Sequence, residues 1–358
     1  MTGIKIIISK NLYKIFIFLS LYLFFFSTAK VESKGFEIDN IEISRPFELN
    51  FDKNIVIDEG FRKAFSELVL LIMNSSDQKK IKQIRLNEIK GMIDSFSIKQ
   101  EKFINDIYYV NLDVTFNKKE IYKFLEKKNI FPSAAPKKNF LFIPIIIDEN
   151  RNELLVFHRN EIFDKWNKNP SSSDLIQYIL PTEDLEDFNL IRNNFEKIEE
   201  YNFKEIISKY SLDESIIALV FKNKNNLRIL SRINVNNKVI LKNQSFSDKN
   251  LSNNENIDYI IKNLKITYED YWKSFNEINT SIKLPIFVKV NGKKTEKISN
   301  FEKILNETDL VYDYNISKID KNFLYYKIIF NGTATVFLKT MNIYNYNFDT
   351  QNKLWILK

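Results

Sequence analysis

One short apolar segment decides the fold that we expect: Asn139-Phe140-Leu141-Phe142-Ile143-Pro144-Ile145-Ile146-Ile147-Asp148. The segment is rich in β-branched and aromatic side chains and lacks polar–apolar alternation, which indicates a strand buried on both faces. Helical patterns precede it at 117–129 and follow it at 184–194, so we expect it to be the core strand of an α/β layer. Pro144 cannot donate a hydrogen bond to a neighbouring strand, and it predicts a bulge or an edge position there.

The first 29 residues have the layout of a secretory signal peptide. A basic region with three lysines precedes an apolar run over 15–26, and the small residues Ser27, Thr28 and Ala29 follow. This layout predicts cleavage between Ala29 and Lys30 and a periplasmic location. The alternative is an uncleaved signal that anchors the chain in the inner membrane, but the apolar run is shorter than the roughly 20 residues that span a bilayer.

Composition excludes several classes of function. The net charge of +7 falls to +4 without the signal peptide, and the basic residues are scattered, so no nucleic-acid surface is expected. The absence of cysteine excludes disulfides and thiol catalysis, and a single histidine, His158, excludes His-dependent triads and multi-His zinc sites. No glycine-rich phosphate loop is present. We therefore expect no catalytic residue, no cofactor and no metal site.

After the signal peptide at 1–29, we expect three regions, at 30–138, 139–280 and 281–358. Strand and helix patterns alternate in all three, which predicts an exported, multi-domain α/β (or α+β) chain of small strand–helix–strand units with mixed sheets.

Three helices are expected from their caps and their apolar spacing. One is expected over 59–73 with Asp58 as its N-cap, and a second over 80–95. The third, over 257–275, carries an aromatic stripe that could stack a sugar or dock a partner but at this spacing is more typical of a core. The aromatic residues of this stripe are Tyr268, Tyr271, Trp272 and Phe275.

A weak internal repeat relates two distant parts of the chain. Phe116-Asn117, followed by 124–130 with Phe-Leu at its start and Asn-Ile at its end, matches Phe330-Asn331 followed by 337–343, with one residue fewer between the two parts. A repeated strand–helix–strand unit would explain this likeness.

One acidic cluster is the only candidate for acid–base or cation chemistry. It comprises Glu183, Asp184, Glu186 and Asp187, and Thr182 precedes it on the same candidate surface. Paired carboxylates can act as general acid and base, or can bind a hard cation. Acidic residues also gather at helix N-termini because the helix dipole and the free N–H groups stabilise them. We favour this second explanation, with Thr182 or Asp184 as the N-cap.

Four segments resemble a known family, at 61–71, 108–116, 140–147 and 180–187, the last being the most specific. They are similar to the secreted proteobacterial proteins catalogued as Domain of Unknown Function 2066, over about residues 36–246. The resemblance implies export and an envelope location, and it brings no catalytic residues. A looser likeness, over 140–275, is to the N-terminal domain of the TolB translocation protein.

We therefore expect an exported, non-enzymatic protein that binds or scaffolds another envelope protein and touches the membrane only through its signal segment. One alternative is a carboxylate-dependent hydrolase that uses Asp184 and Asp187. Another is a purely structural protein whose α/β units pack into a larger assembly.

Overall fold

The computed structural model describes residues 36–168, 174–293 and 295–358. The predicted signal peptide, with its cleavage site between Ala29 and Lys30, lies outside these residues. The described residues form three β-sheets connected through helices, and two of the sheets are mixed, which confirms the α/β class. In this part of the chain, no helix combines the length and the apolar character needed to cross a bilayer.

The central sheet is organised around the apolar segment, which forms β4. Its strands are β4 (Lys138–Asp148), β5 (Glu153–Leu155), β6 (Ile176–Ile179), β7 (Ser215–Asn223), β8 (Asn226–Val235) and β9 (Lys238–Phe246). β4 is parallel to β7 on one side, and on the other side β6 pairs with its first half and β5 with its end. All residues of β4 from Phe140 onward are buried. The prediction of a core strand buried on both faces is confirmed.

Pro144 lies at a local edge of the sheet and not at a bulge, so the edge position of the two predicted is the one observed. It lies opposite the gap between β6, which ends its pairing at Leu141, and β5, which begins at Ile146. The Pro144 carbonyl accepts a hydrogen bond from Nδ2 of Asn160 at 3.0 Å, across that gap. Because the nitrogen and carbonyl oxygen of one strand residue point to the same side, the missing N–H also faces the gap and costs the sheet no hydrogen bond.

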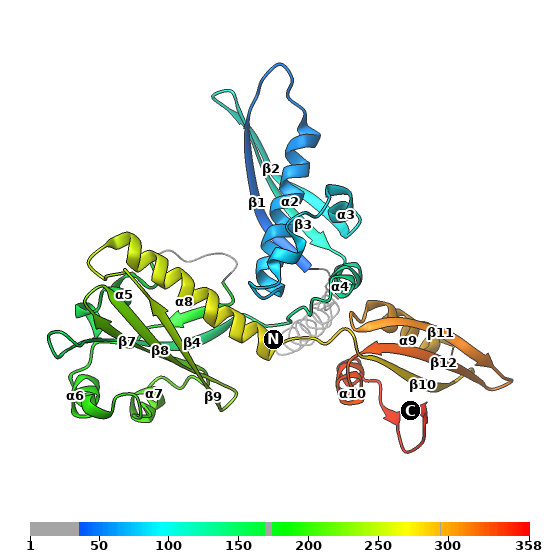
Figure 1. The fold of residues 1–358 in the computed structure, drawn as a ribbon. Coiled ribbons are helices and arrows are strands. Elements are labelled where there is room, and N and C mark those ends of the chain that lie inside the picture. The colour runs from blue at the N-terminus through cyan, green and yellow to red at the C-terminus, as the bar shows by residue number, and fades with distance from the viewer. Residues whose placement is uncertain (1–35, 169–173, 294) are drawn as a thin grey trace, which may run out of the picture. The chain divides into compact units, whose positions relative to one another are not determined.

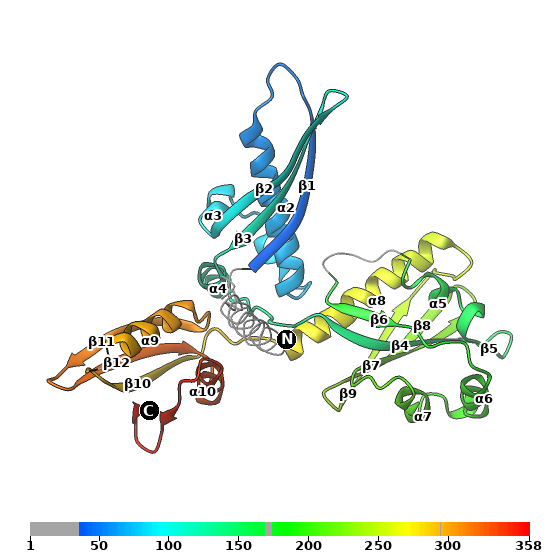
Figure 2. The same ribbon diagram turned by 180° about the vertical axis from the view of Figure 1, so that it is seen from behind.

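Helices cover both faces of the central sheet (Figures 1 and 2). α8 (Asn254–Phe275) packs on one face, and α6 (Leu185–Asn193) and α7 (Lys204–Ser208) pack on the other. The aromatic stripe of α8 belongs to the first of these layers: Tyr268 and Trp272 are buried, and Tyr271 and Phe275 pack against them half-buried. The prediction that the stripe is core is confirmed.

The first and last sheets share one topology, β-α-β-β-α. The N-terminal elements are β1 (Phe36–Pro46), α2 (Lys53–Ile72), β2 (Ile93–Ile104), β3 (Ile107–Phe116) and α4 (Lys118–Lys127). The C-terminal elements are β10 (Lys283–Asn291), α9 (Thr295–Glu307), β11 (Val311–Ile319), β12 (Phe323–Asn331) and α10 (Ala334–Ile343), followed by β13 (Phe348–Asp349) and β14 (Leu354–Leu357). In both sheets the third strand lies between the first and the second and is antiparallel to both. The two segments of the sequence repeat are therefore equivalent strand–helix junctions.

Two predicted helix boundaries in the N-terminal region are wrong. α2 begins at Lys53 with Asp52 as its N-cap, and Asp58 lies inside the helix, where it pairs with Lys90 at 2.7 Å. The predicted helix over 80–95 is instead a 3-10 turn, the short helix α3 (Leu86–Lys90) and the start of β2. Gly91 caps α3, and pairing with β3 then holds the following residues in a strand.

Candidate functional site

The acidic cluster is built at the N-terminus of α6. Asp184 is the N-cap, and its carboxylate accepts a hydrogen bond from the backbone N–H of Glu186 at 2.8 Å. The Thr182 N–H donates to the hydroxyl of Tyr210 at 2.9 Å, and Glu183 is exposed. The helix and its cap are as the sequence predicts.

A single lysine binds three carboxylates of this cluster. Lys209, at the end of α7, places its Nζ 3.1 Å from Asp184, 2.8 Å from Glu186 and 2.7 Å from the buried Asp187. Hydrogen bonds from the Glu186 N–H and from Lys209 lower the pKa of Asp184, and those to Asp187 and Glu186 raise the pKa of Lys209. Asp184, Glu186 and Asp187 thus share one cation, whereas acid–base catalysis needs two carboxyl groups whose pKa values are driven apart.

Neither His158 nor any group of acids forms a metal site in the described ranges. His158 is exposed, and its Nδ1 lies 3.0 Å from Asp164. No three histidine or acidic side chains of the described chain come together as metal ligands.

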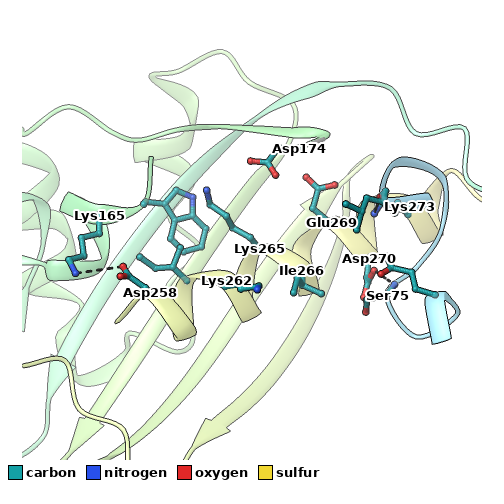
Figure 3. Close-up of a pocket in the computed structure, with 14 residues that line it drawn as sticks. Ser75, Lys165, Asp174, Asp258, Lys262, Lys265, Ile266, Glu269, Asp270 and Lys273 are labelled. Atoms are coloured by element: carbon teal, nitrogen blue, oxygen red, sulfur yellow. Dashed lines mark hydrogen bonds and ion pairs between the residues drawn. The ribbon is translucent and has the colours of Figure 1, made fainter. Parts of the chain in front are cut away.

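A different feature, which we call the α8 cleft, lies along the polar side of α8 and has a volume of about 580 Å³ (Figure 3). Its charged residues are Lys165, Asp174, Asp258, Lys262, Lys265, Glu269, Asp270 and Lys273. Its apolar residues are Leu70, Trp166, Ile261 and Ile266. The cleft therefore combines an apolar lining with charges of both signs.

The sequence of α8 explains why these charges share one side. Asn253 caps the helix by accepting a hydrogen bond from the Glu255 N–H at 2.8 Å. From there Asp258, Lys262, Lys265 and Glu269 follow at intervals of four, three and four residues, the spacing that aligns side chains along one helix face. The opposite face carries the buried aromatic stripe, so packing of the stripe turns the charged row toward the cleft.

Three acidic side chains of the cleft already hold structural partners. Oε1 of Glu269 accepts hydrogen bonds from the backbone N–H groups of Leu175 and Ile176, at 2.9 and 2.8 Å, where β6 begins. Asp270 accepts the N–H and the hydroxyl of Ser75 at 2.8 and 2.5 Å (Figure 3). Asp258 lies 3.6 Å from Nζ of Lys165. Burial raises the pKa of Glu269, against the effect of its two backbone hydrogen bonds.

The lysines in the middle of the cleft have no such carboxylate partners. In the described part of the chain, no carboxylate oxygen lies within 4.0 Å of Nζ of Lys262 or Lys265. Lys265 extends over two aromatic rings, with Nζ 5.8 Å from the ring centroid of Trp166 and 5.7 Å from that of Tyr178. Burial lowers the pKa of Lys265, because desolvation disfavours its charged form. Lys273 is buried and donates to the backbone carbonyl of Leu70.

The aromatic wall of the cleft is closely packed and incompletely hydrogen-bonded. Trp166 stacks on Phe142 of β4, with ring centroids 3.8 Å apart, and meets Tyr178 edge-on at 5.2 Å. Within the described residues, Nε1 of Trp166, the hydroxyl of Tyr178 and Oε2 of Glu269 are buried without a hydrogen-bond partner. Orphaned buried polar atoms are uncommon in folded proteins, and three of those in the described residues lie around Lys265.

The structure thus keeps the predicted acidic residues together and pairs three of them with one lysine. It places the cleft among residues that the sequence does not single out. Lysine is so frequent in this chain that Lys262 and Lys265 carry little information alone. The signal in the sequence that could have indicated them is their helical spacing with Asp258 and Glu269, which places all four on one face of α8. No family model and no curated protein matches this chain.

Proposed function

We propose that this protein is an exported, non-enzymatic binding module of the cell envelope that takes its ligand in the α8 cleft. The observation that carries the proposal is the cleft itself. Ligand sites in proteins are typically concavities of about 300–1,000 Å³ with an apolar lining and a few placed charges. The α8 cleft has this size and this character.

The envelope location is supported by the signal-peptide layout of the first 29 residues and by the resemblance to Domain of Unknown Function 2066. N-terminal sequencing of the exported protein should find Lys30 as the first residue. Recovery of a membrane-integral chain that still begins at Met1 would contradict this expectation.

The alternative, a hydrolase built on Asp184 and Asp187, has less support. Lys209 contacts both carboxylates, and Asp184 also caps α6. Oδ2 of Asp187 has no hydrogen-bond partner among the described residues, but the side chain is buried. A nucleophile or general base needs a lone pair available to substrate or water. The observed contacts commit these carboxylates to holding α6 and α7 together.

A fragment screen tests whether the cleft is a ligand site. Ligand-observed NMR would be run with a set of anionic, cationic and neutral fragments on the mature chain and on Ile266→Trp, which fills the cleft from a partly exposed position. Val239→Trp is the matched control, because Val239 is exposed on β9 and does not line the cleft.

We expect fragments that bind the wild-type chain and the control but not Ile266→Trp. Hits that survive Ile266→Trp, or a screen without hits, would contradict the proposed function.

A further inference from the structure

We propose that the ligand of the α8 cleft is an anionic amphiphile, a carboxylate joined to an extended apolar group, held by Lys265 with Lys262 beside it. This inference rests on the proposed function, because it assigns a chemical class to the ligand of the same cleft.

The charge of the ligand follows from which groups in the cleft are already engaged. Glu269 and Asp270 accept hydrogen bonds from backbone N–H groups, and Asp258 forms an ion pair with Lys165. Lys262 and Lys265, in contrast, have no carboxylate partner among the described residues. Asp174 and Glu269 act on the half-buried Lys265 only from beyond 4.0 Å, so an anion in direct contact with its ammonium group would complement it better than these acids do.

The two lysines can act on one ligand because of their positions on α8. They are three residues apart, which places their side chains next to each other on the helix surface. Figure 3 shows them on the same stretch of α8, on the side that lines the cleft. A single carboxylate, with two oxygens, can accept hydrogen bonds from both.

The orphaned polar atoms agree with an anionic ligand. The Trp166 N–H and the Tyr178 hydroxyl are hydrogen-bond donors beneath Lys265 and lack acceptors among the described residues. The third orphaned atom, Oε2 of Glu269, is an acceptor, so two of the three atoms near Lys265 can donate a hydrogen bond to an anion.

The apolar part of the ligand follows from the remaining lining. Leu70, Ile261 and Ile266 line the cleft together with the indole of Trp166. A small hydrophilic anion such as acetate would leave this surface wet, whereas an alkyl chain would remove it from water and gain about 25 cal/mol for each Å² of apolar surface buried.

The experiment uses laurate as the probe, below its micelle concentration, and titrates it into the mature chain by isothermal calorimetry. Dodecanol and dodecylammonium have the same chain with a neutral and a positive head, and dodecyl phosphate carries a different anion. We expect laurate to bind at least about tenfold more tightly than dodecanol, because a hydrogen bond to a charged group contributes about 1.5–3 kcal/mol. Dodecylammonium should bind more weakly than either.

Variants at the lysines separate charge from packing. Lys265→Met keeps most of the side-chain length and should weaken laurate binding about tenfold without changing dodecanol binding. Lys262→Met, at an exposed position, should fold normally and reduce laurate binding by a smaller factor. Lys238→Met, an exposed residue of β9 outside the cleft, is the control and should bind laurate like the wild-type chain.

The possible outcomes discriminate between the ligand class and the cleft itself. Equal binding of laurate and dodecanol, or unchanged laurate binding in both cleft lysine variants, overturns the assignment of an anion. Tighter binding of dodecyl phosphate than of laurate overturns the carboxylate. Fragment hits that depend on the cleft, together with no laurate binding, overturn this inference and leave the proposed function standing. If neither fragments nor laurate bind in the cleft, both this inference and the proposed function are overturned.

Discussion

Two groups of charged residues, the acidic cluster at α6 and the row along α8, differ in how the fold pairs their charges. The acidic cluster is contiguous in sequence, and its carboxylates end up bound to Lys209 and to the first turn of a helix. The α8 cleft is dispersed from Leu70 to Lys273, and it leaves Lys262 and Lys265 without carboxylate partners among the described residues. This contrast indicates that local density of charge is weaker evidence for a site than charge that the fold leaves unpaired.

The largest expected effect comes from the core beneath the cleft. Phe142→Ala removes the ring on which Trp166 stacks and leaves a cavity in β4, so we expect a loss of about 3–5 kcal/mol in the free energy of unfolding. Urea denaturation of the mature chain measures it.

The matched control is Leu185→Ala, at an apolar side chain of α6 that is 74% exposed beside the acidic cluster, where the change should stay within about 0.5 kcal/mol. If Phe142→Ala and Leu185→Ala lower the free energy of unfolding equally, Phe142 is not part of a packed core beneath the cleft.

Asn160→Ala is expected to have the next largest effect. The fully buried Asn160 caps α5 (Glu161–Lys165) by accepting the N–H groups of Ile162 and Phe163, and it donates to the Pro144 carbonyl. Loss of the cap and of a buried partner should together cost about 2 kcal/mol in the free energy of unfolding.

Asn253→Ala, which removes the exposed cap of α8, should cost about 1 kcal/mol by the same denaturation assay. An Asn160 variant no less stable than this one would show that the Pro144 contact contributes nothing.

Changes in the acidic cluster should be smaller. Asp184→Asn and Asp187→Asn remove charge and keep shape, and asparagine is as good an N-cap as aspartate. We expect slightly lower melting temperatures and unchanged ligand binding in the fragment assay. Loss of a cellular function by orders of magnitude, with a normal melting curve, would instead reveal the hydrolase.

The smallest expected effect is a change in pH dependence at Glu269. Because burial raises its pKa, the folded chain binds this proton more tightly than the unfolded chain does. The resulting stabilisation is present below the unfolded carboxyl's pKa and is lost as pH rises through the folded pKa.

Glu269→Gln keeps an oxygen for the Leu175 and Ile176 N–H groups but has no proton to lose. The variant should therefore gain stability relative to wild type as pH rises through that window. Parallel pH–stability curves would show that Glu269 does not titrate differently in the fold.

The sequence predicts the elements whose evidence is local. The apolar run of β4, the cap of α6 and the aromatic stripe of α8 each depend on neighbouring residues, and all three are confirmed. The helix over 80–95 is wrong because Gly91 and the pairing of β2 with β3 override a periodic apolar pattern. Lys209 and the cleft could not be predicted, since each depends on tertiary contacts between segments far apart in the chain.

The position of Pro144 has a consequence for the chain before it is folded. β4 pairs with β7, in which Ser215 lies opposite Leu141, a residue far away in the sequence. During folding, the apolar, β-branched run of β4 therefore stays unpaired until this distant segment reaches it. Such runs assemble into intermolecular cross-β stacks when they are exposed and carry no proline. Pro144 interrupts the run at the position where the native sheet requires no N–H, so we expect it to disfavour aggregation of the unfolded chain at no cost to the sheet.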